Sequence, residues 1–146
     1  MVRARLVTGR YGTVSAAPLA TLATVAFNPT ARSFGAITAC TTAILLGCTN
    51  VTLPHWQPDE ALEVIERERV SIFGGIPTHF IDCIDAVTRR GERPSSLKSA
   101  WIGGAPVTPD VALAARHALR LEALVAVYGM TETTAVTNAS AISNSA

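Results

Sequence analysis

The chain has 146 residues, the size of one ordinary domain, and 49% of them are hydrophobic, which is enough to build a buried core. Its net charge of +1, without basic clusters or interleaved aromatic residues, argues against a nucleic-acid-binding protein. Cys40, Cys48 and Cys83 show no CxxC spacing, so neither a disulfide framework nor a zinc site is indicated, and a reducing, cytoplasmic location fits best.

The first 58 residues are basic and contain no acidic side chain, because the acidic residues begin at Asp59. A basic start followed by the apolar residues 14–27 is typical of an export signal, but Pro18 and two threonines dilute the apolar stretch. We interpret residues 1–32 as a start that is foreign to the domain after it, and the export signal stays as the alternative.

Two further segments complete the outline of the chain. The apolar run at residues 35–48 predicts a buried helix, and it is shorter than the about 20 residues that a membrane span needs, so we expect no transmembrane segment. Residues 138–146 are uncharged Ala, Ser, Asn and Ile, and they predict a frayed tail.

From residue 50 onward, short apolar runs alternate with amphipathic patterns. This alternation predicts βαβ units, and therefore an α/β fold with a parallel sheet flanked by helices. The expected strands are residues 50–53, 70–73, 99–102 and 123–127. The expected helices are residues 59–69, 78–90 and a third that Thr108 and Pro109 start and that runs to residue 119.

Three of the expected strands are followed by a segment that contains glycine. These segments are Gly74-Gly75, Gly103-Gly104 and Tyr128-Gly129. Because parallel strands in right-handed βαβ units point the same way, we expect these three segments to open on one edge of the sheet as chain turns. Ligands of open α/β sheets bind at that edge.

The segment Tyr128-Gly129-Met130-Thr131-Glu132-Thr133-Thr134 places a hydroxyl and a carboxylate straight after an apolar strand. The hydroxyl of Thr131 is suited to a phosphate oxygen. A carboxylate beside a polyphosphate is repulsive unless a divalent cation lies between them, and Mg²⁺ is commonly held by one or two carboxylates plus substrate phosphates. Glu132 therefore predicts a magnesium-nucleotide site.

This heptad resembles the Tyr-Gly-x-Thr-Glu motif of the adenylate-forming (AMP-binding) enzymes, which include acyl-CoA synthetases, aryl-CoA ligases, luciferases and peptide-synthetase adenylation domains. Gly103-Gly104-Ala105-Pro106 is similar to the Gly-Gly-Ala-Pro of fatty-acyl and aryl-CoA ligases, and Gly74-Gly75-Ile76-Pro77-Thr78 resembles the Gly-x-Pro-Thr that precedes both. The three segments have the family's order and spacing, and the resemblance runs from about Ser33 to Thr134.

The resemblance implies a role for each matched residue. It assigns the segment Gly103, Gly104, Ala105 and Pro106 to the adenine and the wall of the acyl pocket. Tyr128, with Gly129 and Met130 beside it, would stack on adenine, while Thr131 would contact a phosphate oxygen and Glu132 would bind Mg²⁺. The implied cofactors are ATP/AMP, Mg²⁺ and coenzyme A as co-substrate.

Structural explanations stand beside these roles. Gly103 to Pro106 also fits a tight turn from a strand to a helix, Tyr128 a half-buried aromatic residue, and Thr133 and Thr134 the cap or lining of a turn. His79 either lines the acyl pocket or is a helical histidine with satisfied contacts.

The resemblance also marks what differs from the family. Members are several times longer and carry a Gly/Ser/Thr-rich phosphate loop that ends in Lys-Gly, which residues 1–32 lack, and Lys98 is the sole lysine. Pro29-Thr30-Ala31-Arg32-Ser33-Phe34-Gly35 stands where the family usually has Pro-Leu-Phe-His-x-Phe-Gly. We therefore expect residues 33–137 to be part of an adenylating domain, between a non-matching segment at 1–32 and a tail at 138–146.

The expected function is that of a fragment of an ATP-dependent acyl-CoA synthetase of fatty-acid metabolism, inactive when isolated. Its parent would take a small carboxylic acid, ATP and coenzyme A. The alternative is a catalytically inactive truncated paralogue that acts as an interaction module. In either case we expect exposed apolar surface and self-association.

Overall fold

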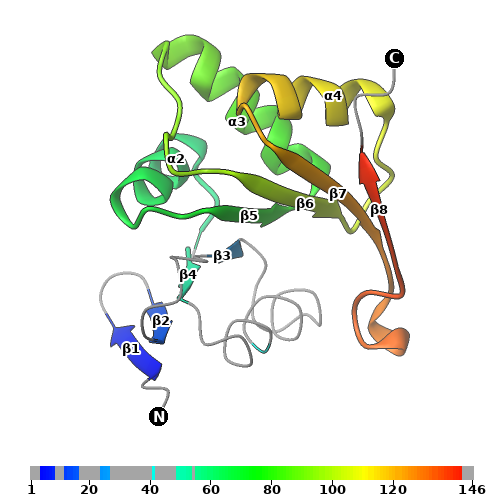
Figure 1. Cartoon of the computed structure of the whole chain (residues 1–146), viewed down its shortest axis with the longest axis horizontal. Helices are drawn as coiled ribbons and strands as arrows, with labels where there is room; N and C mark the ends of the chain where they lie inside the picture. Colours follow the sequence, from blue (N-terminus) through cyan, green and yellow to red (C-terminus); the bar gives the residue numbers. More distant parts are fainter. Residues whose placement is uncertain are drawn as a thin grey trace.

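The computed structural model describes residues 4–8, 12–16, 24–26, 41, 49–53 and 55–142, and these contain one mixed sheet (Figure 1). Its strand order is β1-β2-β4-β3-β5-β6-β7-β8. The strands are β1 (Ala4–Thr8), β2 (Gly12–Ala16), β3 (Thr24–Ala26), β4 (Asn50–Thr52), β5 (Ile72–Gly75), β6 (Ser99–Gly103), β7 (Ala123–Tyr128) and β8 (Asn138–Ile142).

The predicted parallel arrangement holds for the centre of this sheet. Strands β4, β3, β5, β6 and β7 are parallel to one another. Strand β1 pairs antiparallel with β2, β2 with β4, and β8 with β7. The link from Tyr128 to Asn138 is too short for the helical crossover that a parallel return requires, because such a crossover takes about a dozen residues or more. The sheet is therefore mixed rather than wholly parallel.

The prediction of a frayed tail is wrong for residues 138–142. These residues form β8, which pairs with β7 from Tyr128↔Asn138 to Leu124↔Ile142. The composition did not indicate this strand, because Asn, Ala and Ser have weak strand propensity. Backbone pairing with β7 holds β8 in place.

In the described part of the chain, three helices lie side by side over one face of the sheet (Figure 1). They are α2 (Pro58–Arg67), α3 (Pro77–Arg90) and α4 (Pro109–Ala118), and α3 contacts both of the others. Each begins with a proline, whose missing N–H costs nothing in the first turn. The Thr108 side chain accepts a hydrogen bond from the Val111 amide, so the predicted N-cap is confirmed.

The core lies between these helices and the sheet. Alternate strand residues point toward the helices, as the period of two requires. Fully buried side chains from both layers are Phe73, Ile102, Leu124, Ile65, Phe80, Cys83 and Ala115. Among the residues described, no helix is both long and apolar enough to cross a bilayer.

Strand β5 starts two residues later than predicted. Val70 belongs instead to the turn that follows α2, because its amide donates to the Ile65 carbonyl at 2.8 Å while Arg69 adopts a left-handed φ of 52°. Gly74 and Gly75 consequently lie inside β5 and are not a turn. A Cβ on Gly74 would lie 2.5 Å from the Trp101 ring on β6, so glycine makes room for that side chain.

The start of α3 is fixed by an aromatic stack. The His79 ring lies 4.1 Å from the Trp56 ring, and the Trp56 indole N–H donates to Asp82 at 2.6 Å. Burial lowers the pKa of His79 to about 4, with the Asp82 carboxylate acting in the opposite direction. His79 is therefore a neutral, buried residue in the first turn of α3.

Several sequence expectations lie outside the described residues. The expected helix at 35–48 is one, apart from Thr41, and the departure at residues 29–35 is another. Of residues 1–32, the structure describes β1, β2 and β3, which pair within the same sheet as the motif-bearing strands.

Candidate functional site

The three motif segments meet at one edge of the sheet, as the sequence predicts. Gly75 pairs with Ile102, and Gly103 pairs with Val127, so the carboxyl ends of β5, β6 and β7 lie next to one another. A Cβ on Gly104 would lie 3.1 Å from the Ile76 side chain, which brings the segment after β6 against the segment after β5. The shared edge follows from the parallel order of the three strands.

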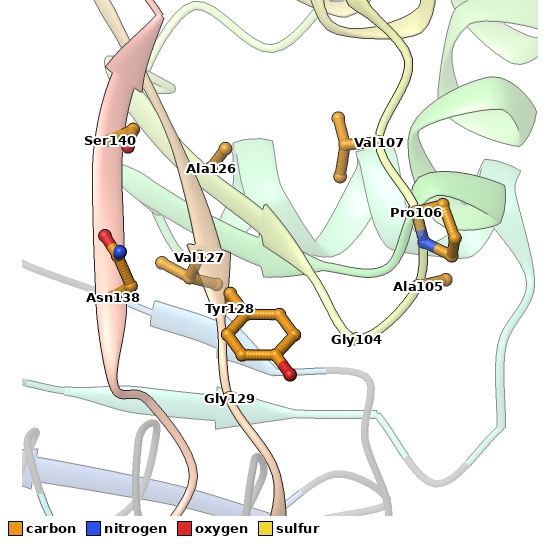
Figure 2. Close-up of a pocket in the computed structure, with 10 residues that line it drawn as sticks. All are labelled: Gly104, Ala105, Pro106, Val107, Ala126, Val127, Tyr128, Gly129, Asn138 and Ser140. Carbon is orange, nitrogen blue, oxygen red and sulfur yellow. The ribbon is translucent and has the colours of Figure 1, made fainter.

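A cavity of about 540 Å³ opens at this edge (Figure 2). This volume is within the range of small-molecule sites, roughly 300–1,000 Å³. The wall comes from the loop after β6, the end of β7 and the facing part of β8. Its residues are Gly104, Ala105, Pro106, Val107, Ala126, Val127, Tyr128, Gly129, Asn138 and Ser140.

Tyr128 stands at the mouth of the cavity. Its side chain is 64% exposed, and Figure 2 shows the ring between β7 and the loop at Gly104 to Pro106. A half-buried aromatic residue, the alternative explanation for this position, would be covered more fully. An exposed ring beside an apolar wall is instead suited to stacking on a flat ligand.

Beyond Tyr128 the chain forms a closed loop that carries the 3-10 helix η2 (Thr131–Thr133). The Ala135 amide donates to the Met130 carbonyl at 3.1 Å, and the Thr137 amide donates to the Tyr128 carbonyl at 2.9 Å. A Cβ on Gly129 would overlap the Ala135 carbonyl, so this position requires glycine. The closure fixes where η2 stands relative to the cavity.

Thr131 and Glu132 are exposed on η2, two and three residues after Gly129 of the cavity wall, and neither is itself part of that wall. Within the described residues, no three His, Cys, Asp or Glu side chains are grouped to hold a metal ion. A single exposed carboxylate beside a hydroxyl nevertheless fits Mg²⁺, which often takes one carboxylate and completes its shell with phosphates and water.

The other predicted site residues divide in two. Gly104, Ala105, Pro106, Tyr128 and Gly129 line the cavity, whereas Gly103 and Met130 do not. Gly103 is buried at the end of β6, where a Cβ would lie 2.5 Å from the Val127 side chain, and Met130 is exposed at the start of η2.

Sequence reasoning missed Asn138 and Ser140, because both belong to the segment interpreted as a tail. They reach the cavity only through the pairing of β8 with β7. Two wall residues, Ala126 and Val127, were predicted as strand and carried no other signal.

Comparison with known proteins identifies the family. A family model described as AMP-binding enzyme matches residues 4–145, which extends beyond the stretch that holds the motifs. The chain is 29% identical over 111 residues to the acyl-CoA ligase cnsG of Penicillium expansum, covering 75% of this chain and 23% of that protein. It is 39% identical over 94 residues to the feruloyl-CoA synthase of an Amycolatopsis species, covering 64% and 18%.

Solved structures give the same fold. The o-succinylbenzoate coenzyme A synthetase MenE of Bacillus subtilis, determined in complex with ATP and magnesium ion, superposes with a TM-score of 0.70 at 19% identity, covering 81% of this chain and 24% of that one. The amide bond synthetase McbA of Marinactinospora thermotolerans superposes with a TM-score of 0.65 at 31% identity, covering 80% and 23%.

This chain spans less than a quarter of the length of the curated relatives it matches. One assignment follows from the family model and from the acyl-CoA ligase relatives. The fold agrees with it, because the chain also superposes on the N-terminal domain of FACL13 from Mycobacterium tuberculosis. The chain belongs to the AMP-binding enzyme family, the adenylate-forming enzymes of the acyl-CoA synthetase type.

Proposed function

We propose that this chain supplies the nucleotide-binding edge of an ATP-dependent acyl-CoA ligase. The observation that carries the proposal is an apolar cavity at this edge with an exposed Tyr128 ring in its wall, followed directly along the chain by an exposed hydroxyl-carboxylate pair on η2. Support also comes from the names of the relatives, which are acyl-CoA ligases and a feruloyl-CoA synthase. The alternative of an inactive interaction module gains no support from these relatives.

In the proposed reaction, a carboxylate oxygen of the acid attacks the α-phosphorus of ATP and pyrophosphate leaves. The thiol of coenzyme A then attacks the carbonyl carbon of the acyl-adenylate, and AMP leaves. Both reactants of the first step are anions, so the protein must neutralise charge and hold the groups in line. Mg²⁺, when bound, would neutralise part of the charge on the phosphates.

Each site residue has a proposed part in this reaction. Tyr128 and the wall from Gly104 to Pro106 hold the adenine ring. The Thr131 hydroxyl donates to a phosphate oxygen, and the Glu132 carboxylate binds the magnesium ion. The acid is a fatty or an aromatic acid, because the relatives include both a medium-chain acyl-CoA ligase and a feruloyl-CoA synthase.

The one lysine of the chain lies at the far end of the sheet. Lys98 immediately precedes β6, whereas the cavity is at the end of that strand, and Lys98 forms an ion pair with Glu122 at 3.2 Å. It therefore does not stabilise charge at the site. We expect these 146 residues alone to catalyse no ATP–pyrophosphate exchange, because losing even one charge-stabilising donor costs about 10² to 10³ in rate.

A chimera tests the proposal. The matching 94-residue stretch of the feruloyl-CoA synthase is replaced by that of this chain, and ATP–pyrophosphate exchange is measured with fatty and aromatic acids. We expect exchange by the chimera, loss with Glu132→Ala, and no loss with the control Glu122→Ala at the opposite end of β7. A folded chimera no more active than its Glu132→Ala variant would contradict the proposal.

The location remains the cytoplasm as a proposal from cysteine usage. Cys83 is a buried free cysteine, and burial raises the pKa of its thiol to about 12, so it behaves as a core residue. One relative, the medium-chain acyl-CoA ligase ACSF2 of Homo sapiens, is described as mitochondrial.

A further inference from the structure

Two polar side chains reach the cavity from β8, outside every sequence motif. In the antiparallel pairing, Asn138 lies opposite Tyr128 and Ser140 lies opposite Ala126. Directly opposed residues of an antiparallel pair share a face of the sheet and have Cβ atoms about 4.5–5.5 Å apart. Asn138 is therefore a direct neighbour of the ring at the mouth of the cavity.

Among the residues that the structure describes, the remaining wall offers few polar side chains for recognition. Of the residues that line the cavity, those with a polar side chain are Tyr128, Asn138 and Ser140. Figure 2 shows the Asn138 amide and the Ser140 hydroxyl on the β8 side, across β7 from Ala105 and Pro106. The apolar wall fits the faces of a flat ring, and a few placed polar groups set orientation and specificity in such sites.

An asparagine amide matches the edge of adenine. The amide has one acceptor oxygen and a donor NH₂ group, and adenine presents an amino donor next to a ring-nitrogen acceptor. Guanine presents two acceptors, O6 and N7, on the corresponding edge, so an amide cannot pair with both groups in the same way. A carboxylate at this position would accept hydrogen bonds only, and would lose the pairing with the adenine ring nitrogen.

We propose that Asn138 is a specificity-determining residue of this site, whose side-chain amide hydrogen-bonds the edge of the adenine base while Tyr128 stacks on its face. Ser140, next along the same face of β8, borders the base on that side. The inference rests on the proposed nucleotide site, and it adds a base-reading residue on a strand that the family motifs do not include.

The test compares AMP with GMP, because neither requires Glu132 or a metal to present its base. Binding of each nucleotide to the 146-residue chain is measured by titration calorimetry for wild type, Asn138→Asp and Asn138→Ala. Ala139→Asp is the matched control, since it adds the same carboxylate on the neighbouring β8 residue, which faces the other side of the sheet. Circular dichroism establishes that each variant is folded.

We expect wild type to prefer AMP. Both Asn138 variants should bind AMP about tenfold more weakly, in line with the discrimination of one bidentate amide–base pair, and Asn138→Asp should lower the AMP:GMP affinity ratio. Ala139→Asp should leave the ratio unchanged. Asn138→Ala provides the test if Asn138→Asp fails to fold.

Two results would overturn the proposal: an unchanged AMP:GMP ratio in a folded Asn138 variant, and a wild-type chain that binds neither nucleotide. Failure of the proposed function looks different. In that case the preference for AMP over GMP would depend on Asn138, while the affinity for ATP would be the same with and without Mg²⁺ and would not change in a Glu132 variant.

Discussion

The Thr133 hydroxyl bonds to both backbone groups of Met130. It accepts a hydrogen bond from the Met130 amide at 3.3 Å and donates one to the Met130 carbonyl at 3.0 Å. These two contacts close η2 on itself, and Thr131 and Glu132 are exposed on it. Thr133 thus has the capping role that the sequence left as one explanation for it.

We predict that Thr133→Ala weakens Mg·ATP binding and that Thr133→Ser restores it. The alanine variant loses two hydrogen bonds of about 0.5–1.5 kcal/mol each, and its loop no longer holds Thr131 and Glu132 in one position. The expected loss in affinity is about tenfold by calorimetry. Thr88→Ala on α3 is the control, and equal affinities for Thr133→Ala and this control would show that the contacts do not position the site.

Gly129→Ala should destabilise the chain more than other glycine substitutions. Its added Cβ would meet the Ala135 backbone carbonyl, which no rotation of a side chain can relieve. We expect a loss of about 1–3 kcal/mol in unfolding free energy, the usual cost of overpacking. Gly91→Ala is the comparison, since it has open space around it and a φ of 69°, and should cost about 1 kcal/mol. Equal urea midpoints for the two variants would refute the tight closure of the loop.

His79 should make stability depend on pH between about 6.5 and 4. Burial lowers its pKa to about 4 in the folded chain, so the unfolded chain binds more protons in this interval. The stabilisation is complete above pH 6.5 and is lost as the pH falls toward 4. Urea unfolding at pH 7.5 and pH 5 should show a smaller decrease for His79→Phe than for wild type, and an unaltered decrease for the exposed His117→Gln. If His79→Phe matched wild type at both pH values, His79 would not be the group responsible.

We predict that the chain self-associates through β8. Within the described residues, β8 pairs on one side, with β7, and an uncharged edge strand is a template for pairing with another chain. Sedimentation velocity should find species larger than a monomer, and Ala139→Lys should reduce them because an edge lysine opposes pairing. A monomeric wild type would contradict the prediction.

The helices were predictable because their signals are local. Proline in the first turn, the Thr108 cap and Gly91 at a φ of 69° mark the ends of α2, α3 and α4 to within two residues. Strand limits were less accurate, since the apolar pattern includes Val70 although its amide closes α2. The apolar pattern of the sequence identifies buried residues, but the hydrogen-bond pairing between strands decides which of them belong to a strand.

The residues of the candidate site were also predictable only in part. The turn after β6 and the Tyr128 segment could be found because each is contiguous in the chain and the parallel order brings them together. Asn138 and Ser140 could not, because their place in the wall depends on antiparallel pairing across β7 and β8 that no local pattern of Asn, Ala and Ser encodes.

The central claim is that Glu132 binds magnesium for a nucleotide in this cavity. Calorimetric titration of ATP, with and without Mg²⁺, into wild type and Glu132→Gln tests it most directly, with the exposed Glu122→Gln as the matched control. We predict weak binding that requires Mg²⁺, is retained by Glu122→Gln and is reduced at least tenfold by Glu132→Gln, the loss expected for one charged ligand. Equal magnesium-dependent binding by Glu132→Gln and wild type would contradict the claim.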